Sequence, residues 1–128
     1  MRLGSIALMV KSMDKMVAFY RDVVGFPIQW DGSGFTGVKL PNGMYFNLCA
    51  RELMDPECKF SYPEGINGTM EINISFDSIE EVDREYNRYI QCGAKEIQKP
   101  IARVYGIYES FVADPEGNLI ELNCGIDE

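Results

Sequence analysis

The chain carries the same short pattern twice, and this repetition limits its fold more than any other feature. Residues 41–48 read PNGMYFNL and residues 115–122 read PEGNLIEL, so Pro, Gly and a closing Leu recur 74 positions apart. Upstream, SIALMVKSMDKMVAFY from Ser5 and EINISFDSIEEVDREY from Glu71 share an apolar pattern 66 positions apart. Similar segments at a fixed spacing indicate an internal repeat. We therefore predict two duplicated modules.

Each module is predicted to run strand, helix and then three strands. Ser12 and Ser78 are candidate helix N-caps, Ser78 in an S-x-x-E capping box, and Gly25 and Gly93 end the two helices. Strands are expected at residues 3–10, 28–30, 35–40 and 44–50, and again at 69–76, 94–98, 105–113 and 118–124. The predicted organisation is a first module at 1–50, a turn-rich connecting loop at 51–68 and a second module at 69–128, in one structural domain.

The two faces of these strands differ in chemistry, because side chains alternate along a strand. One face is apolar and should pack on the helices, whereas the other is polar. The polar positions are Ser5, Asn47, Glu71, Asn73, Ser75, Glu121 and Asn123. A solvated face is one interpretation. We favour the lining of a cleft, because Asn, Ser, Met, Tyr and Cys stand where a solvated sheet usually carries Lys, Glu and Thr.

Three further charged residues belong near this face. Lys39 and Glu109 share its strand parity, and the simplest interpretation is an ion pair across the sheet. Arg103 precedes a Val-Tyr-Gly turn and is expected to be a solvated loop residue.

Composition excludes several function classes. The 128 residues carry a net charge of −8, which disfavours nucleic acid or anionic membrane as a partner. The chain has no histidine, which removes Ser-His-Asp and Cys-His machinery and imidazole-ligated metals. No segment approaches the length of a membrane span, and no signal peptide is evident. The four cysteines lack CxxC spacing, so reduced thiols and a cytoplasmic location are expected.

The segments SMDKMVAFYRDVVGF and YGIYESFVADPEGNLIEL, together with two βαβββ patterns, resemble the vicinal oxygen chelate superfamily of glyoxalases, bleomycin-resistance proteins and extradiol dioxygenases. The resemblance covers essentially the whole chain. It implies an α+β fold in which the two modules form a curved mixed sheet around a cavity, with helices on the outer face. It also implies a homodimer.

In the metalloenzymes of this superfamily a divalent metal is held from the first and last strands of each module. The resemblance carries these places onto Ser5, Asn47, Glu71 and Glu121, of which only Glu121 is the usual residue. No metal is favoured, since neutral serine is a poor ligand and imidazole is missing. An alternative is a metal-dependent lyase, isomerase or dioxygenase with an oxygen-only site for Mg²⁺, Mn²⁺ or Ca²⁺ at Asn47, Glu71 and Glu121, with Glu121 or Glu71 as catalytic base.

The favoured interpretation is a small-molecule binder similar to the drug-sequestering members, which take cationic or aromatic compounds in a cleft. Glu71 and Glu121 would supply negative charge, and aromatic rings would stack on the compound. The candidate ligand-binding residues are Ser5, Trp30, Phe35, Tyr45, Asn47, Glu71, Asn73, Tyr105, Phe111 and Glu121.

Overall fold

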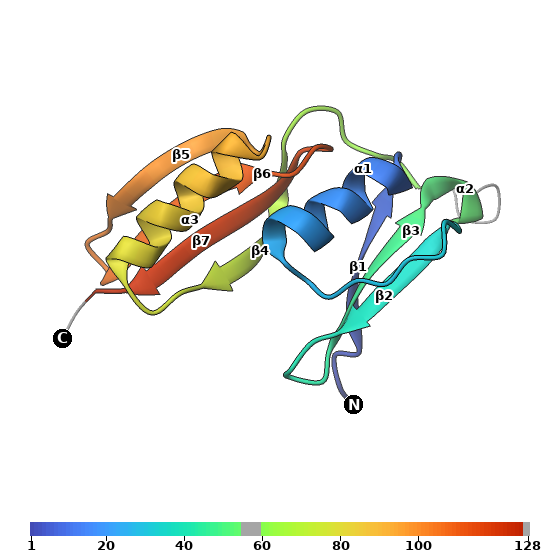
Figure 1. Ribbon diagram of the computed structural model, residues 1–128, viewed down its shortest axis with the longest axis horizontal. Coiled ribbons are helices and arrows are strands. Elements are labelled where there is room, and N and C mark those ends of the chain that lie inside the picture. Colours follow the sequence, from blue (N-terminus) through green and yellow to red (C-terminus); the bar gives the residue numbers. More distant parts are fainter. Residues whose placement is uncertain (55–59, 127–128) are drawn as a thin grey trace. The chain divides into compact units, whose positions relative to one another are not determined.

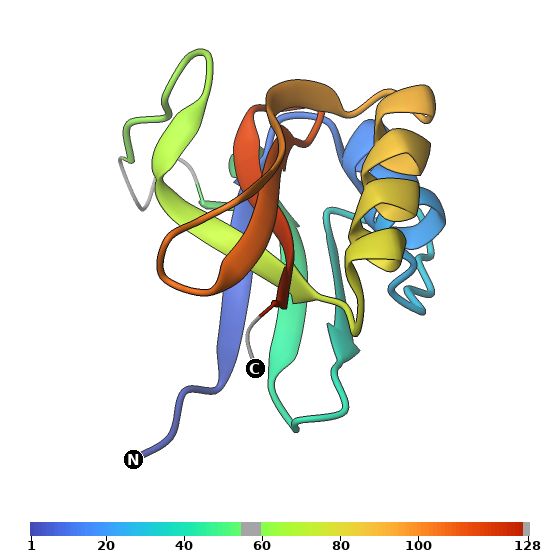
Figure 2. The same ribbon diagram turned by 90° about the vertical axis from the view of Figure 1, so that its left-hand side faces the viewer.

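The computed structural model describes residues 1–54 and 60–126. The chain divides into two compact units, Met1–Tyr62 and Pro63–Glu128, and this division falls inside the predicted connecting loop. Each unit contains one mixed β-sheet with a helix against one of its faces (Figures 1 and 2). Cys58 lies outside the described residues.

The first unit holds a three-stranded sheet. Its elements are β1 (Ser5–Val10), α1 (Met13–Ala18), the π-helical segment η1 (Phe19–Val24), β2 (Phe35–Lys39), β3 (Tyr45–Ala50) and the short helix α2 (Arg51–Met54). The strand order is β1-β3-β2, with β1 parallel and β2 antiparallel to β3. The Ser12 hydroxyl caps α1 by accepting from the Lys15 amide, and Gly25 ends the helical run at φ 95°, as predicted.

The predicted strand at residues 28–30 is wrong. Its backbone groups are used locally, since the Ile28 amide donates to the Phe26 carbonyl at 2.7 Å. The Gln29 carbonyl accepts from the Thr36 hydroxyl at 2.9 Å, so a side chain takes the place of a ladder partner. The first unit is therefore βαββ, and a short apolar run was not enough to form a strand.

The second unit holds a four-stranded sheet. Its elements are β4 (Asn67–Ser75), α3 (Ile79–Gln91), β5 (Lys95–Ala102), β6 (Ile107–Ala113) and β7 (Asn118–Gly125), in the strand order β4-β7-β6-β5. Helix α3 packs on β5, β6 and β7 (Figure 1). The interface is apolar, with Val82 and Tyr89 of the helix and Val112, Ile120 and Leu122 of the sheet all buried.

Strand β5 continues beyond its predicted end at residue 98 and crosses Pro100. Proline lacks an N–H, but β5 lies at the edge of its sheet, where a missing donor is tolerated. The pairing of β5 with β6 also shifts register twice along this stretch.

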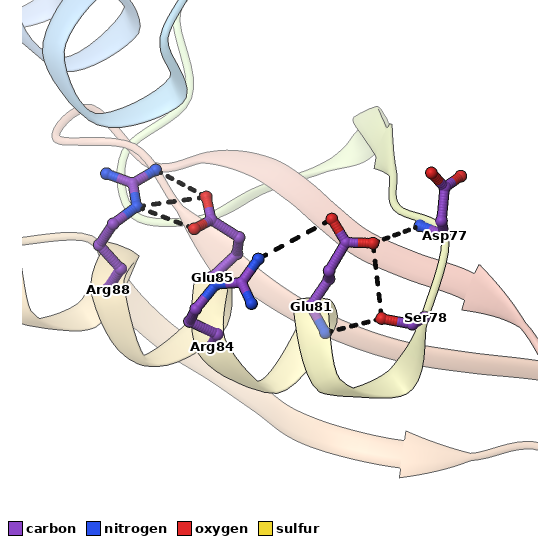
Figure 3. A network of polar contacts seen from close by, with 6 residues as sticks. All are labelled: Asp77, Ser78, Glu81, Arg84, Glu85 and Arg88. Carbon is purple, nitrogen blue, oxygen red and sulfur yellow. Dashed lines mark hydrogen bonds and ion pairs between the residues drawn. The ribbon is translucent and has the colours of Figure 1, made fainter.

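The predicted capping box at the start of α3 is confirmed, with one difference (Figure 3). The Ser78 hydroxyl accepts from the Glu81 amide at 3.1 Å. The Glu81 carboxylate accepts from the amide of Asp77, one residue before the cap, at 3.2 Å. Further along the helix, Arg84 pairs with Glu81, and Arg88 with Glu85, on the exposed surface. Exposed pairs of this kind contribute little stability, so packing of the apolar face decides where α3 lies.

The strand registers confirm the internal repeat. Strand β1 pairs with β3 from Ser5–Tyr45 to Val10–Ala50, and β4 pairs with β7 from Glu71–Leu119 to Ser75–Asn123. Ser5 and Glu71 are 66 positions apart, and Tyr45 and Leu119 are 74 apart, the two separations found in the sequence. Each residue of β3, and each residue of β1 from Ser5 to Met9, therefore has a structural counterpart in β7 or β4.

Candidate functional site

One face of the second unit's sheet gathers polar side chains from neighbouring strands. The amide–carboxylate cluster consists of Glu71, Asn73 and Ser75 from β4, and Glu121 and Asn123 from β7. The register sets Asn73 opposite Glu121 and Ser75 opposite Asn123, so these side chains emerge next to one another. On the other side of β7, strand β6 sets Phe111 opposite Glu121 and Glu109 opposite Asn123.

Hydrogen bonds join the cluster into one network. The Asn123 Nδ2 donates to Asn73 Oδ1 at 3.0 Å and also to Glu121 Oε2. The Ser75 hydroxyl donates to Asn123 Oδ1 at 2.9 Å. At the far end, Asn73 Nδ2 approaches Glu71 Oε2 at 3.5 Å. Each carboxylate therefore faces an asparagine amide, and Asn123 links the two strands.

Glu121 is the least solvated carboxylate of this cluster, with 7% of its surface exposed. Burial raises its pKa to about 7, the hydrogen bond with Glu71 and the charges of Glu71 and Glu109 act in the same direction, and the hydrogen bond from Asn123 opposes them. Within residues 1–54 and 60–126, no lysine or arginine forms an ion pair with Glu121. A buried carboxylate without a cation favours either a bound proton or a cationic ligand.

Glu109, in contrast, already has a cation. Arg103 Nε lies 2.6 Å from Glu109 Oε2, and the Tyr105 hydroxyl donates to the same oxygen at 3.0 Å. Arg103 lies in the turn between β5 and β6 with 37% of its side chain exposed, as expected of a loop residue, and its guanidinium also pairs with a carboxylate that is almost fully buried. Lys39 lies in the other unit, so its expected ion pair with Glu109 stays a prediction.

Four predicted site residues of the first unit share one face of its own sheet: Ser5, Phe35, Tyr45 and Asn47. Ser5 lies opposite Tyr45, and Asn47 lies between Ala7 and Gly37. A Cβ added to Gly37 would come within 2.1 Å of Asn47 Oδ1, so the glycine makes room for this amide. The amide–carboxylate network is not repeated, because Ala7, Met9 and Cys49 stand at the counterparts of Asn73, Ser75 and Asn123.

Trp30 and Phe35 line a shallow pocket of about 320 Å³ on the first unit, together with Gln29, Asp31 and Thr36. The Trp30 Nε1 donates to the Ser33 carbonyl at 2.8 Å, which fixes the indole in the pocket wall. Their part in ligand binding stays a prediction.

A second hollow, of about 550 Å³, lies between α3 and β5 and contains none of the predicted site residues. Its lining includes Tyr86 and Glu96, which hydrogen-bond to each other, and Asp83, which accepts from the Tyr108 hydroxyl at 2.7 Å. Burial, followed by the hydrogen bond to Glu96, raises the pKa of Tyr86. The hydrogen bond to Asp83, followed by burial, raises the pKa of Tyr108 to about 12. Both phenols therefore stay neutral at ordinary pH.

Sequence reasoning found Glu71, Asn73 and Glu121 but left Asn123, Glu109 and Arg103 out of the site. Strand parity placed Asn123 on the correct face, and only the register reveals that its amide reaches Glu121 and Asn73. Tyr105 and Phe111 were predicted, and the structure places Tyr105 on Glu109 and Phe111 opposite Glu121.

Comparison with known proteins decides the family. The model of the Glyoxalase/Bleomycin resistance protein/Dioxygenase superfamily matches residues 2–122. The chain belongs to this superfamily. An uncharacterised protein of Bacillus subtilis (strain 168), YraH, is 30% identical over 125 residues, which are 95% of this chain and 97% of that protein.

Solved structures of the superfamily share the fold. A glyoxalase/bleomycin resistance protein/dioxygenase family enzyme from Burkholderia phytofirmans PsJN has a TM-score of 0.83 and 26% identity, over 97% of this chain and 98% of its own. The lactoylglutathione lyase from Agrobacterium tumefaciens has a TM-score of 0.72 and 21% identity, over 97% and 93%. The predicted α+β glyoxalase-like fold is confirmed. In the described part of the chain, no helix has the length and apolarity needed to span a membrane.

The superfamily implies a metal at the places of Ser5, Asn47, Glu71 and Glu121, and the donor set of this chain does not fit it. Two places are uncharged and none is an imidazole. The Asn123 Nδ2 donates to Glu121 Oε2, so an oxygen of the one residue that matches the usual ligand already accepts a hydrogen bond. In the described ranges, no three His, Cys, Asp or Glu side chains gather as a metal cluster.

Proposed function

We propose that this protein binds a cationic small molecule through Glu121, on the polar face of the second unit's sheet. The observation that carries the proposal is the burial of Glu121 without a cation among the described residues. An unpaired buried carboxylate is destabilising, and a ligand ammonium or amidinium group would neutralise it. Glu71 adds a second negative charge beside the same position.

The neighbouring charges support a cation over an anion. Arg103 is the one arginine paired with a carboxylate on this face in the described residues, and Glu109 neutralises it. What remains is the pair Glu71 and Glu121, whose mutual repulsion a ligand cation relieves. A ligand that binds therefore lowers the pKa of Glu121 and favours its ionised form.

An aromatic surface next to the carboxylate supports an organic cation. Phe111 stands opposite Glu121 in the register, at the short distance of cross-strand neighbours. An ammonium group against a phenyl ring gains a cation–π attraction in addition to the ion pair. The exposed ring of Tyr105, held by Glu109, is a second candidate for such contact.

The remaining expectations belong to the same proposal. We propose a cytoplasmic homodimer without a resident metal. The described thiols Cys49, Cys92 and Cys124 are all free, which suits a reducing compartment. Exposed apolar side chains such as Met70 on the edge strand β4 offer surface for a second copy.

The test uses benzyltrimethylammonium, whose charge does not change with pH, and benzyl alcohol as a neutral counterpart. Calorimetry at pH 8 is expected to give at least tenfold tighter binding of the cation to the wild-type protein. Glu121→Gln should lose that preference, whereas Glu64→Gln, which removes an exposed carboxylate before β4, should keep it. Equal binding of the two compounds, or equal behaviour of the two variants, would contradict the proposal.

A second candidate is a lyase or isomerase in which Glu121 is a general base. The observation in its favour is the pKa of about 7, close to the value that makes a base effective at neutral pH. Thermal stability is therefore also measured with Mg²⁺, Mn²⁺ and Ca²⁺, ions that accept oxygen ligands. Stabilisation by one of them that disappears in Glu121→Gln would favour the enzyme and count against the metal-free binder.

A further inference from the structure

The hollow between α3 and β5 lies within the second unit, away from the amide–carboxylate cluster. Helix α3 contacts the edge strand β5, and residues of both elements form the walls (Figure 1). Glu121 faces the other side of the sheet, because its neighbours Ile120 and Leu122 are buried beneath α3. A volume of about 550 Å³ is in the range of small-molecule sites. A ligand bound here would therefore need no contact with Glu121.

Two carboxylates of the hollow are each held by a tyrosine hydroxyl. The Tyr86 hydroxyl donates to Glu96 Oε2, and the Tyr108 hydroxyl donates to Asp83 Oδ1 at 2.7 Å. Tyr86 is 4% exposed, so the donor to Glu96 comes from the core. Among the described residues, no group donates to Glu96 Oε1 or Asp83 Oδ2, and no lysine or arginine pairs with either side chain. Each carboxylate therefore has one held oxygen and one oxygen available to a ligand.

The two carboxylates belong to different places along the hollow. Glu96 lies opposite Val112 in the pairing of β5 with β6, and Tyr108, which holds Asp83, lies four residues before Val112 on β6. Four residues of a strand span about 13 Å. Carboxylates placed in this way favour an elongated molecule with a cationic group at each end over a single ammonium group between them.

The walls of the same hollow also carry a positive charge and an apolar surface. Lys99 of β5 lines the hollow and forms no ion pair with a described residue. Ile90 of α3 and Pro100 of β5 supply apolar surface. The lining therefore combines two negative charges, one positive charge and a place for a hydrocarbon stem. Its chemical complement has two cationic groups, one anionic group and an aliphatic chain.

We propose that this hollow binds an amino acid whose side chain ends in an ammonium group, as in lysine. One ammonium group pairs with Asp83 and the other with Glu96. The methylene chain lies on Ile90, and the α-carboxylate pairs with Lys99. Charge-assisted hydrogen bonds of this kind are stronger than neutral ones, and the tyrosine hydroxyls fix the carboxylates before the ligand arrives, which lowers the entropy lost on binding.

The first experiment compares L-lysine with three analogues that each lack one charged group. Norleucine lacks the side-chain ammonium, ε-aminocaproate lacks the α-ammonium and cadaverine lacks the carboxylate. In calorimetry with the wild-type protein, norleucine and ε-aminocaproate should bind roughly tenfold more weakly than L-lysine. Cadaverine should bind roughly threefold more weakly, because Lys99 is exposed and an exposed ion pair contributes less. Absence of L-lysine binding, or an analogue that binds as tightly as L-lysine, would overturn the inference.

The second experiment removes the charges of the walls while keeping their hydrogen bonds. Asp83→Asn and Glu96→Gln retain an oxygen that can accept from the tyrosine hydroxyl, so their Tm values should stay within about 3 °C of the wild type. Each should weaken L-lysine binding roughly tenfold. Lys99→Gln should weaken L-lysine binding roughly threefold without weakening cadaverine binding. An affinity for L-lysine that is unchanged in either carboxylate variant would contradict the proposed site.

Two further variants separate this site from other carboxylates. Glu64→Gln removes an exposed carboxylate outside the hollow and should bind L-lysine like the wild type. Glu121→Gln removes the carboxylate of the proposed function and should also bind L-lysine like the wild type, so the two proposals succeed or fail separately. Loss of L-lysine binding in Glu121→Gln would place the ligand at the cluster and overturn the assignment to the hollow.

Discussion

Replacing Glu121 by glutamine is expected to stabilise the folded protein, and to do so only where the wild-type carboxyl is ionised. Glutamine keeps the size of the side chain, and its Oε1 can still accept from the Asn123 amide. Its Nε2 can donate to Glu71, so that the repulsion between two carboxylates becomes an attraction. Glu121 in the wild type would then lower the stability of the fold while serving the proposed ligand binding.

The magnitude follows from the pKa of Glu121, which rises from 4.5 to about 7 on folding. A raised pKa means that the folded state holds the proton more tightly than the unfolded state, so the stability contributed by this proton is present in full below pH 4.5. It is lost as the pH rises to about 7. Each pH unit in this window costs about 1.4 kcal/mol, which gives a total of about 3 kcal/mol.

Urea denaturation of wild type and Glu121→Gln at pH 4.5, 6, 7 and 8 measures this difference. The variant should match the wild type at the lowest pH and exceed it by about 3 kcal/mol at pH 8, which corresponds to roughly 10 °C in Tm. Groups that titrate alike in both proteins cancel in the comparison. A difference that does not change with pH, or a variant less stable at pH 8, would refute the reasoning.

Two local predictions test the packing of the modules. Gly37→Ala is expected to destabilise the fold by about 1–3 kcal/mol in urea denaturation, because the new Cβ clashes with Asn47 Oδ1. Adding Asn47→Ala should restore most of the lost stability, and a double variant as unstable as Gly37→Ala would argue against this contact. Ser78→Ala is expected to cost about 1 kcal/mol through loss of the α3 N-cap, with Ser61→Ala, an exposed serine outside the helices and strands, as the control that should change nothing.

Much of the candidate site could be predicted from the pattern of residues. Period-two alternation placed Glu71, Asn73 and Glu121 on one polar face, since each strand turns successive side chains to opposite sides. The Pro-x-Gly hairpins gave the repeat, and the repeat gave the counterparts of every β1 and β3 residue. The superfamily resemblance rested on the same hairpins and the first helix, and both the family and its α+β fold are confirmed.

The partners within that face could not be predicted. The pairing of Glu109 with Arg103 depends on the path of the β5–β6 hairpin. The register shifts of this hairpin cannot be predicted from the local residue pattern. The strand predicted at residues 28–30 does not form for a similar reason, a contact that the local residue pattern does not predict. A hydroxyl from Thr36 reached the Gln29 carbonyl and replaced a ladder bond that the apolar run alone had suggested.

The sequence by itself determined the duplicated module, the polar face and the absence of imidazole, because these depend on residue type and spacing. The tertiary structure decided the charge state of that face. Burial, the neighbouring Glu71 and the Asn123 amide together set the pKa of Glu121, and all three are properties of groups brought close from separate strands. The sequence identifies a carboxyl group, whereas its desolvation and hydrogen bonds in the folded protein decide at which pH it is charged.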